Sequence, residues 1–159
     1  MNYSKALNEC IESAYMVAGH FGARYLESWH LLIAMSNHSY SVAGATLNDY
    51  PYEMDRLEEV ALELTETDYS QDETFTELPF SHRLQVLFDE AEYVASVVHA
   101  KVLGTEHVLY AILHDGNALA TRILERAGFS YEDKKDQVKI AALRRNLEER
   151  AGWTREDLK

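Results

Sequence analysis

Hydrophobic residues recur at spacings of three and four along most of this 159-residue chain, a period that predicts amphipathic helices. The two clearest stripes begin just after Ser4 and Ser81, and serine is a favoured helix N-cap residue. Only two prolines and seven glycines interrupt the chain, which also favours helices. The first stripe comprises Leu7, Cys10, Ile11, Ala14, Val17, Ala18 and Phe21, and the second Leu84, Leu87, Phe88, Ala91, Val94, Ala95 and Val98.

The two stripes belong to two copies of one unit. Displaced by 77 positions, residues 3–47 align with 80–124 without a gap, and pairs such as Leu26/Leu103 and His30/His107 are identical. Each copy predicts four helices, so we expect an all-α fold of two tandem four-helix repeats, about eight helices, related by pseudo-twofold symmetry. After the capped first helices, the others are predicted at about 30–35 and 107–113 with Ser28 and Thr105 as caps, at about 41–48 and 117–126 with Gly128 as a stop, and at about 53–65 and 131–147.

The polar segments set the expected boundaries. Residues 51–79 contain ten acidic side chains and one basic residue, Arg56. Their later part has no apolar period and reads as a linker. We therefore predict a single domain over 1–150, with repeat one at 1–66, an acidic linker at 67–79 and repeat two at 80–150. Residues 151–159, where Gly152 would interrupt a helix, are interpreted as the start of a linker to a further module.

Composition excludes several classes of partner. A formal net charge of −12 argues against nucleic acid, whose phosphates need clustered basic residues, and against anionic membranes. No apolar run approaches the length of a membrane-spanning helix, and the first ten residues lack the layout of a signal peptide. The single cysteine, Cys10, excludes an internal disulfide and is typical of the reducing cytoplasm. Its place on the apolar stripe predicts that it is buried.

The segment Leu103-Gly104-Thr105-Glu106-His107-Val108-Leu109 opens the second helix of the second copy. Together with Phe80-Ser81, the pair Ala91 and Ala95, and the small residues from Ala118 to Leu124, it resembles the Clp repeat. That repeat, doubled, forms the N-terminal domain of ClpC- and ClpE-type (Hsp100) Clp ATPase subunits. The resemblance covers about residues 1–150, and the duplication makes it more specific than a single motif.

The resemblance implies a docking domain that binds client proteins and adaptors of the MecA type. An ATPase ring, using ATP and Mg in the full-length protein, would then unfold the clients for degradation by ClpP. This chain contains no P-loop sequence, and we expect it to hold no catalytic residue, cofactor or metal. The alternative is a freestanding Clp-repeat adaptor or accessory subunit of the Clp protease.

Some members of the family recognise phosphoarginine, and the resemblance carries that site to Ser81, Glu106 and Thr105. A helix N-terminus can bind the phosphoryl group, and a carboxylate can bind the guanidinium. In the first repeat Ser4 is kept, but Trp29 stands where the glutamate belongs, so this copy is degenerate. We expect at most one intact phosphoarginine site.

Each of these residues also has a structural interpretation. Glu106 favours its own helix start, Trp29 is expected in or at the edge of the core, and the two recurring histidines indicate packing or capping. Tyr3 and Phe80 are predicted to pack onto the helices that follow them. A di-iron enzyme is the remaining rival, since Glu27 and His30 have Glu-x-x-His spacing, but Gly104 breaks the pattern in the second copy.

Overall fold

The computed structural model describes residues 1–49, 56–65, 77–115, 118–128, 140–154 and 156–158. Within these ranges the chain forms eight α-helices and, apart from two isolated bridge pairs, no β-structure, which confirms the all-α prediction. The helices are α1 Lys5–His20, α2 Ser28–Ser36, α3 Val42–Leu47, α4 Leu57–Thr65, α5 His82–Val97, α6 Thr105–His114, α7 Leu119–Gly128 and α8 Ile140–Ala151.

The starts of the long helices are where the sequence predicts them. The Ser4 hydroxyl accepts a hydrogen bond from the Leu7 N–H at 3.1 Å, and the Ser81 hydroxyl does the same for the Leu84 N–H. The caps of α2 and α6 are predicted one residue too late. Ser28 and Thr105 are the first helical residues, and the residues before them take the extended N-cap conformation.

The remaining predicted boundaries are only partly tested. Gly128 is the last residue of α7, close to its predicted role as a stop. Helix α4 begins at Leu57, and residues 50–55 lie outside the described ranges. The last residue of helix α8 is Ala151, and the next residue, Gly152, has a left-handed φ of 74°. The predicted start of this helix falls in 129–139, which is also outside the described residues.

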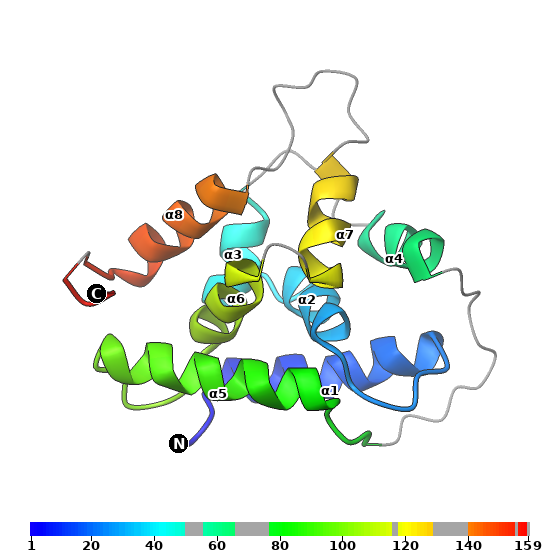
Figure 1. Cartoon of the computed structure of the whole chain (residues 1–159), viewed down its shortest axis with the longest axis horizontal. Helices are drawn as coiled ribbons and strands as arrows, with labels where there is room; N and C mark the ends of the chain where they lie inside the picture. The colour runs from blue at the N-terminus through cyan, green and yellow to red at the C-terminus, as the bar shows by residue number, and fades with distance from the viewer. Residues whose placement is uncertain (50–55, 66–76, 116–117, 129–139, 155, 159) are drawn as a thin grey trace.

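The two repeats exchange their outer helices. Helices α1 and α5 lie along one edge of the molecule, α2 and α6 cross its middle, and α4 and α8 flank the two sides (Figure 1). Helix α8 of the second repeat packs on α3 of the first, and α4 of the first packs on α7 of the second. At the α3–α8 contact, the side chains of Asn146 and Arg150 both bind the Asp49 carboxylate. Neither repeat therefore completes its core alone.

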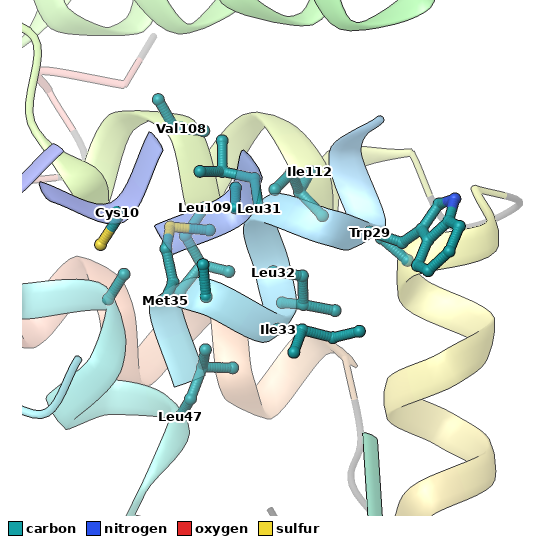
Figure 2. Packing of buried hydrophobic residues seen from close by; sticks show 14 of the residues in the cluster. Cys10, Trp29, Leu31, Leu32, Ile33, Met35, Leu47, Val108, Leu109 and Ile112 are labelled. Atoms are coloured by element: carbon teal, nitrogen blue, oxygen red, sulfur yellow. The ribbon is translucent and has the colours of Figure 1, made fainter. Parts of the chain in front are cut away.

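The two central helices are enclosed by the others. Every residue of α2 from Trp29 to Ser36 is buried, and Cys10 is buried beside this helix, as predicted. Figure 2 shows Leu31, Leu32 and Met35 of α2 in one cluster with side chains of α1, α3 and α6. Burial raises the pKa of the Cys10 thiol to about 11, so it stays protonated and unreactive near neutral pH.

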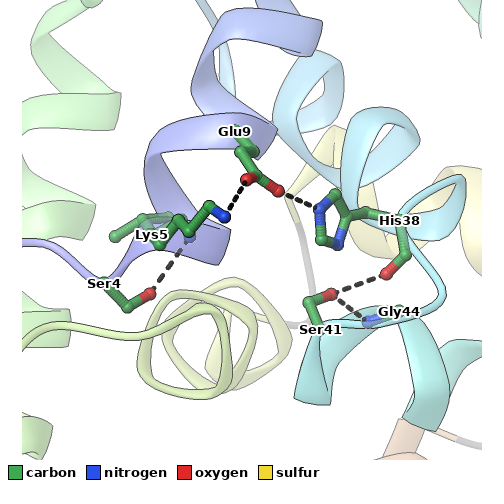
Figure 3. A network of polar contacts seen from close by, with 7 residues as sticks. Ser4, Lys5, Glu9, His38, Ser41 and Gly44 are labelled. Atoms are coloured by element: carbon green, nitrogen blue, oxygen red, sulfur yellow. Dashed lines mark hydrogen bonds and ion pairs between the residues drawn. The ribbon is translucent and has the colours of Figure 1, made fainter.

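A polar network fixes α1 to the turn between α2 and α3 (Figure 3). The Glu9 carboxylate on α1 binds the His38 ring at 2.7 Å, and the hydrogen bond from His38 holds the pKa of Glu9 below its usual range. The Ser41 hydroxyl then donates to the His38 carbonyl and accepts from the Gly44 N–H, so it caps α3 against the same turn.

Candidate functional site

The starts of the first and second helices meet across the repeats, not within them. The Ser4 N–H donates to the Leu103 carbonyl at 2.8 Å, and the Ser81 N–H donates to the Leu26 carbonyl at 3.0 Å. Parallel bridges pair Tyr3 with Leu103 and Leu26 with Phe80 at the same two places. Because each bridge becomes the other when the repeats are exchanged, these junctions show the twofold relation directly.

This exchange corrects the predicted pairing of Ser81 with Glu106. The Ser81 hydroxyl donates to the Glu27 carboxylate of the first repeat at 3.2 Å. Nearby, Arg83 reaches Asp115 just beyond the end of α6, at 3.5 Å. Glu106 lies at the other end of α6, roughly 13 Å from Asp115 along the helix axis at 1.5 Å per residue. The helix start that carries Glu106 instead meets Ser4. A site that combines Glu106 with a helix-capping serine would therefore take its serine from the other repeat.

The Glu106 carboxylate folds back over the start of its own helix. A Cβ atom at Gly104 would overlap this carboxylate, so the missing side chain at 104 makes the space that Glu106 fills. Burial raises the pKa of Glu106, while a hydrogen bond from its own backbone N–H opposes the rise. Within the described part of the chain, its one neighbour at ion-pair distance is the His107 ring, 3.4 Å away.

The other two residues of the predicted sites are structural in this fold. Thr105 is buried, and its hydroxyl accepts a hydrogen bond from the Ala43 N–H of α3 at 3.2 Å, so it has no open side for a ligand. Trp29 is only 9% exposed and packs edge-on against Phe21, with ring centroids 4.6 Å apart. The expectation that Trp29 lies in or at the edge of the core is confirmed.

The recurring histidines cap the helices that contain them. His30 Nδ1 accepts the Glu27 N–H at 2.9 Å, and His107 Nδ1 accepts the Gly104 N–H at 2.8 Å. A nitrogen that accepts in this way is unprotonated, so the short distance between His107 and the Glu106 carboxylate is no ion pair. Burial lowers the pKa of His30 to about 3 and that of His107 to about 4. The capping interpretation of both residues is confirmed.

The sequence interpretation missed an apolar groove between α5 and α6. It measures about 540 Å³, and Val86 and Tyr93 on its wall are 43% and 69% exposed. The carboxylates of Asp89 and Glu90 lie along it, and no lysine or arginine is among the described residues that line it. Its lining comprises Val86, Asp89, Glu90, Tyr93, Val94, Val97, Tyr110, Ala111, His114 and Leu158. We call this hollow the α5–α6 groove.

A sequence signal for this groove does exist. Val86, Tyr93 and Val97 follow one another at spacings of seven and four, which marks a second apolar stripe on the helix that carries the core stripe. A second, more polar hollow of about 560 Å³ adjoins the groove, since Val86, Glu90 and Ala111 line both. Glu27 and Trp29 border this second hollow.

Two other properties bear on function. Among the described residues, no group of three or more His, Cys, Asp or Glu side chains is arranged to hold a metal ion. The Glu27 carboxylate of the Glu-x-x-His pair accepts the Ser81 hydroxyl. No helix in the described ranges is both long and apolar enough to span a bilayer.

The architecture defines a duplicated helical domain with an apolar groove between α5 and α6. Residues 2–127 match the family described as the Clp repeat (R) N-terminal domain. The chain belongs to this family. No curated protein sequence shows significant similarity to it.

Solved structures share the fold at low sequence identity. The N-terminal domain of the chaperone ClpD from Arabidopsis thaliana is similar, with a TM-score of 0.72 and 16% identity over 95% of each chain. The N-terminal domain of Hsp104 from Candida albicans has a TM-score of 0.71 and 17% identity, covering 99% of this chain and 96% of its own. A structure from work on a malarial protein secretion system has a TM-score of 0.64 and 19% identity, covering 94% and 97%.

Proposed function

We propose that this domain is a receptor for client proteins and adaptors of an Hsp100-type ATPase, and that it performs no chemistry itself. The observation that carries the proposal is the α5–α6 groove, an apolar hollow on whose wall Val86 and Tyr93 stay exposed. Membership of the Clp repeat family supports the same role. The proposed partners include adaptors of the MecA type. Bound clients would be unfolded by ATPase modules that use ATP and Mg, and would then be delivered to ClpP.

The chemistry of the groove favours one kind of partner. Its apolar wall fits leucine- or phenylalanine-sized side chains, and the carboxylates of Asp89 and Glu90 favour lysine or arginine beside them. The chain's formal net charge of −12 adds long-range attraction for a basic segment. A flexible connection to the ATPase would then hold weakly bound clients at high local concentration.

We expect Val86→Ser and Tyr93→Ser to weaken binding of a short synthetic peptide, with leucine and phenylalanine flanked by lysines, by about tenfold each. Both side chains are exposed, so the fold should be unchanged. Fluorescence anisotropy of the labelled peptide measures the affinity, and added salt should weaken it.

Matched controls come from exposed apolar residues away from the groove. Tyr25→Ser and Val102→Ser, at positions 54% and 42% exposed, should bind the peptide like the parent protein. A version of the peptide with glutamates in place of lysines should bind much less well. Equal affinity for all four variants would reject the groove as the docking site.

Phosphoarginine recognition is the second candidate, and the state of Glu106 favours it. This carboxylate is largely buried at a helix start, and within the described residues no lysine or arginine is paired with it. A guanidinium would supply the missing positive charge. The junction with Ser4 supplies the second half of this site, whereas Trp29 occupies the equivalent position at the junction with Ser81.

Calorimetric titration with free phosphoarginine should therefore give saturable binding near one equivalent. Glu106→Ala should abolish the heat and leave the helical circular dichroism intact, since removing a charged partner costs a charge-assisted bond and not core packing. Arginine and inorganic phosphate serve as controls. Binding by Glu106→Ala as tight as that of the parent would remove Glu106 from the site.

A further inference from the structure

The end of α8 is folded back by a specific turn. The Trp153 N–H donates to the Glu148 carbonyl at 3.0 Å, and the Gly152 N–H donates to the Glu149 carbonyl at 3.1 Å. With Gly152 at a φ of 74°, these two bonds form a Schellman motif, which ends the helix and reverses the chain. The following residues are thereby directed onto the second repeat.

Trp153 anchors the returning segment on α6. Its ring stacks on His107 with centroids 5.6 Å apart and planes 16° apart, and it meets Tyr110 edge-on at 5.5 Å. Tyr110 also lines the α5–α6 groove and carries the Arg144 guanidinium of α8 over its ring, 5.3 Å from the centroid. The anchor is therefore in contact with the wall of the groove.

A short turn then brings the chain to the wall of the groove. The Thr154 N–H and hydroxyl both donate to the Asp157 carboxylate at 2.9 Å, and the Asp157 N–H donates back to the Thr154 hydroxyl at 3.2 Å. These bonds lower the pKa of Asp157, with His99 at the end of α5 adding to the effect. Leu158, the next residue, is partly buried and lines the groove.

We propose that this C-terminal segment, Trp153 and Thr154 with residues 156–158, is an intramolecular occupant of the α5–α6 groove, and that a docked partner must displace Leu158. This inference rests on the proposed function of the groove. Because two occupants of one place exclude each other, docking of a partner and docking of the segment weaken each other by the same factor. Partner binding would then release the segment that follows α8.

Thiol labelling tests the occupancy without any partner. Val97→Cys places a reactive thiol on the groove wall, and native Cys10 is buried and protonated, so it adds no background. We expect labelling of Val97→Cys by a thiol reagent to become several-fold faster when Leu158→Ser is added. Labelling of Val102→Cys, outside the groove lining, should not change with Leu158→Ser. Equal rates for Val97→Cys with and without Leu158→Ser would overturn the proposal.

Peptide affinity tests the competition. We expect Leu158→Ser to bind the leucine–lysine peptide about fivefold more tightly than the parent protein, the factor for losing roughly half a leucine's burial. Trp153→Ala, which removes the anchor, should change affinity in the same direction. Equal affinity of the parent and Leu158→Ser would overturn the exclusion. If neither protein binds the peptide while labelling still accelerates, the proposed function fails and the occupancy of the groove is supported.

Discussion

Acidification from pH 7 to pH 5 is expected to reduce the free energy of unfolding by about 4 kcal/mol, about 2 kcal/mol for each of the two buried histidines. His30 and His107 both accept a backbone N–H through Nδ1 in the core. Burial lowers their pKa values to about 3 and about 4, from an ordinary value of 6.5. This is the largest effect that we expect from a change of conditions.

The direction follows from which state binds the proton. Between pH 6.5 and about 4, the histidines of the unfolded chain are protonated and those of the folded chain are neutral, so each added proton favours unfolding. Stability is therefore fully present above pH 6.5 and falls as the pH is lowered. Glu106 opposes this trend in part, because its raised pKa makes the folded state take up a proton more readily.

Urea titrations across this range measure the effect, and a pair of neutral substitutions provides the control. Glutamine at the third helical position can also accept the cap N–H, but it does not titrate. His30→Gln with His107→Gln should therefore flatten the pH dependence, whatever its stability at neutral pH. A double variant with an unchanged slope would assign the acid sensitivity to other groups.

Gly44→Ala is expected to destabilise the protein by about 3 kcal/mol, although alanine is the better helix former by about 1 kcal/mol. Gly44 lies in α3, where a Cβ atom would overlap the backbone carbonyl of His38 and come within 2.7 Å of the Met35 carbonyl oxygen. Backbone atoms cannot turn aside as a side chain can. Helix α3 would have to move away and lose the Ser41 cap, and thermal or urea unfolding would report the loss.

Gly104→Ala is the matched control. A Cβ atom at this position overlaps only the flexible end of the Glu106 side chain, which can rotate away. Stability should change by less than about 1 kcal/mol. The displaced carboxylate should nevertheless weaken phosphoarginine binding, if Glu106 binds it. A loss of stability in Gly104→Ala as large as in Gly44→Ala would show that backbone overlap is not the cause.

Much of the fold could be predicted because the signals are local or periodic. The serine caps of α1 and α5, the burial of Cys10 and the duplicated arrangement of helices all follow from short spacings along the chain. The caps of α2 and α6 were placed one residue late, because the polar cap of each helix is a histidine ring inside it. The usual N-cap residues are serine, threonine, aspartate and asparagine, and a histidine at the third helical position is not one of these signals.

The candidate site was harder to predict, because its residues meet through contacts between the repeats. The ring of Tyr3 lies 5.7 Å from Phe88 in the other repeat, a contact that the predicted packing on its own helix does not include, whereas Phe80 packs on Phe88 as predicted. Ser81 likewise binds Glu27, 54 positions earlier in the sequence. An alignment of the two copies shows that they are equivalent. It does not show that the partners are exchanged.

The all-helical class, the duplication and the family resemblance could all be read from the amino-acid sequence, because helix periodicity and repeat spacing act over a few residues or recur unchanged. Three features became visible only in the folded chain: which copy supplies each partner, where Glu106 lies, and that Leu158 lines the α5–α6 groove. These contacts form because α2 and α6 are apolar on nearly all sides and must be covered from both repeats. Side chains distant in sequence are brought together by that shared burial.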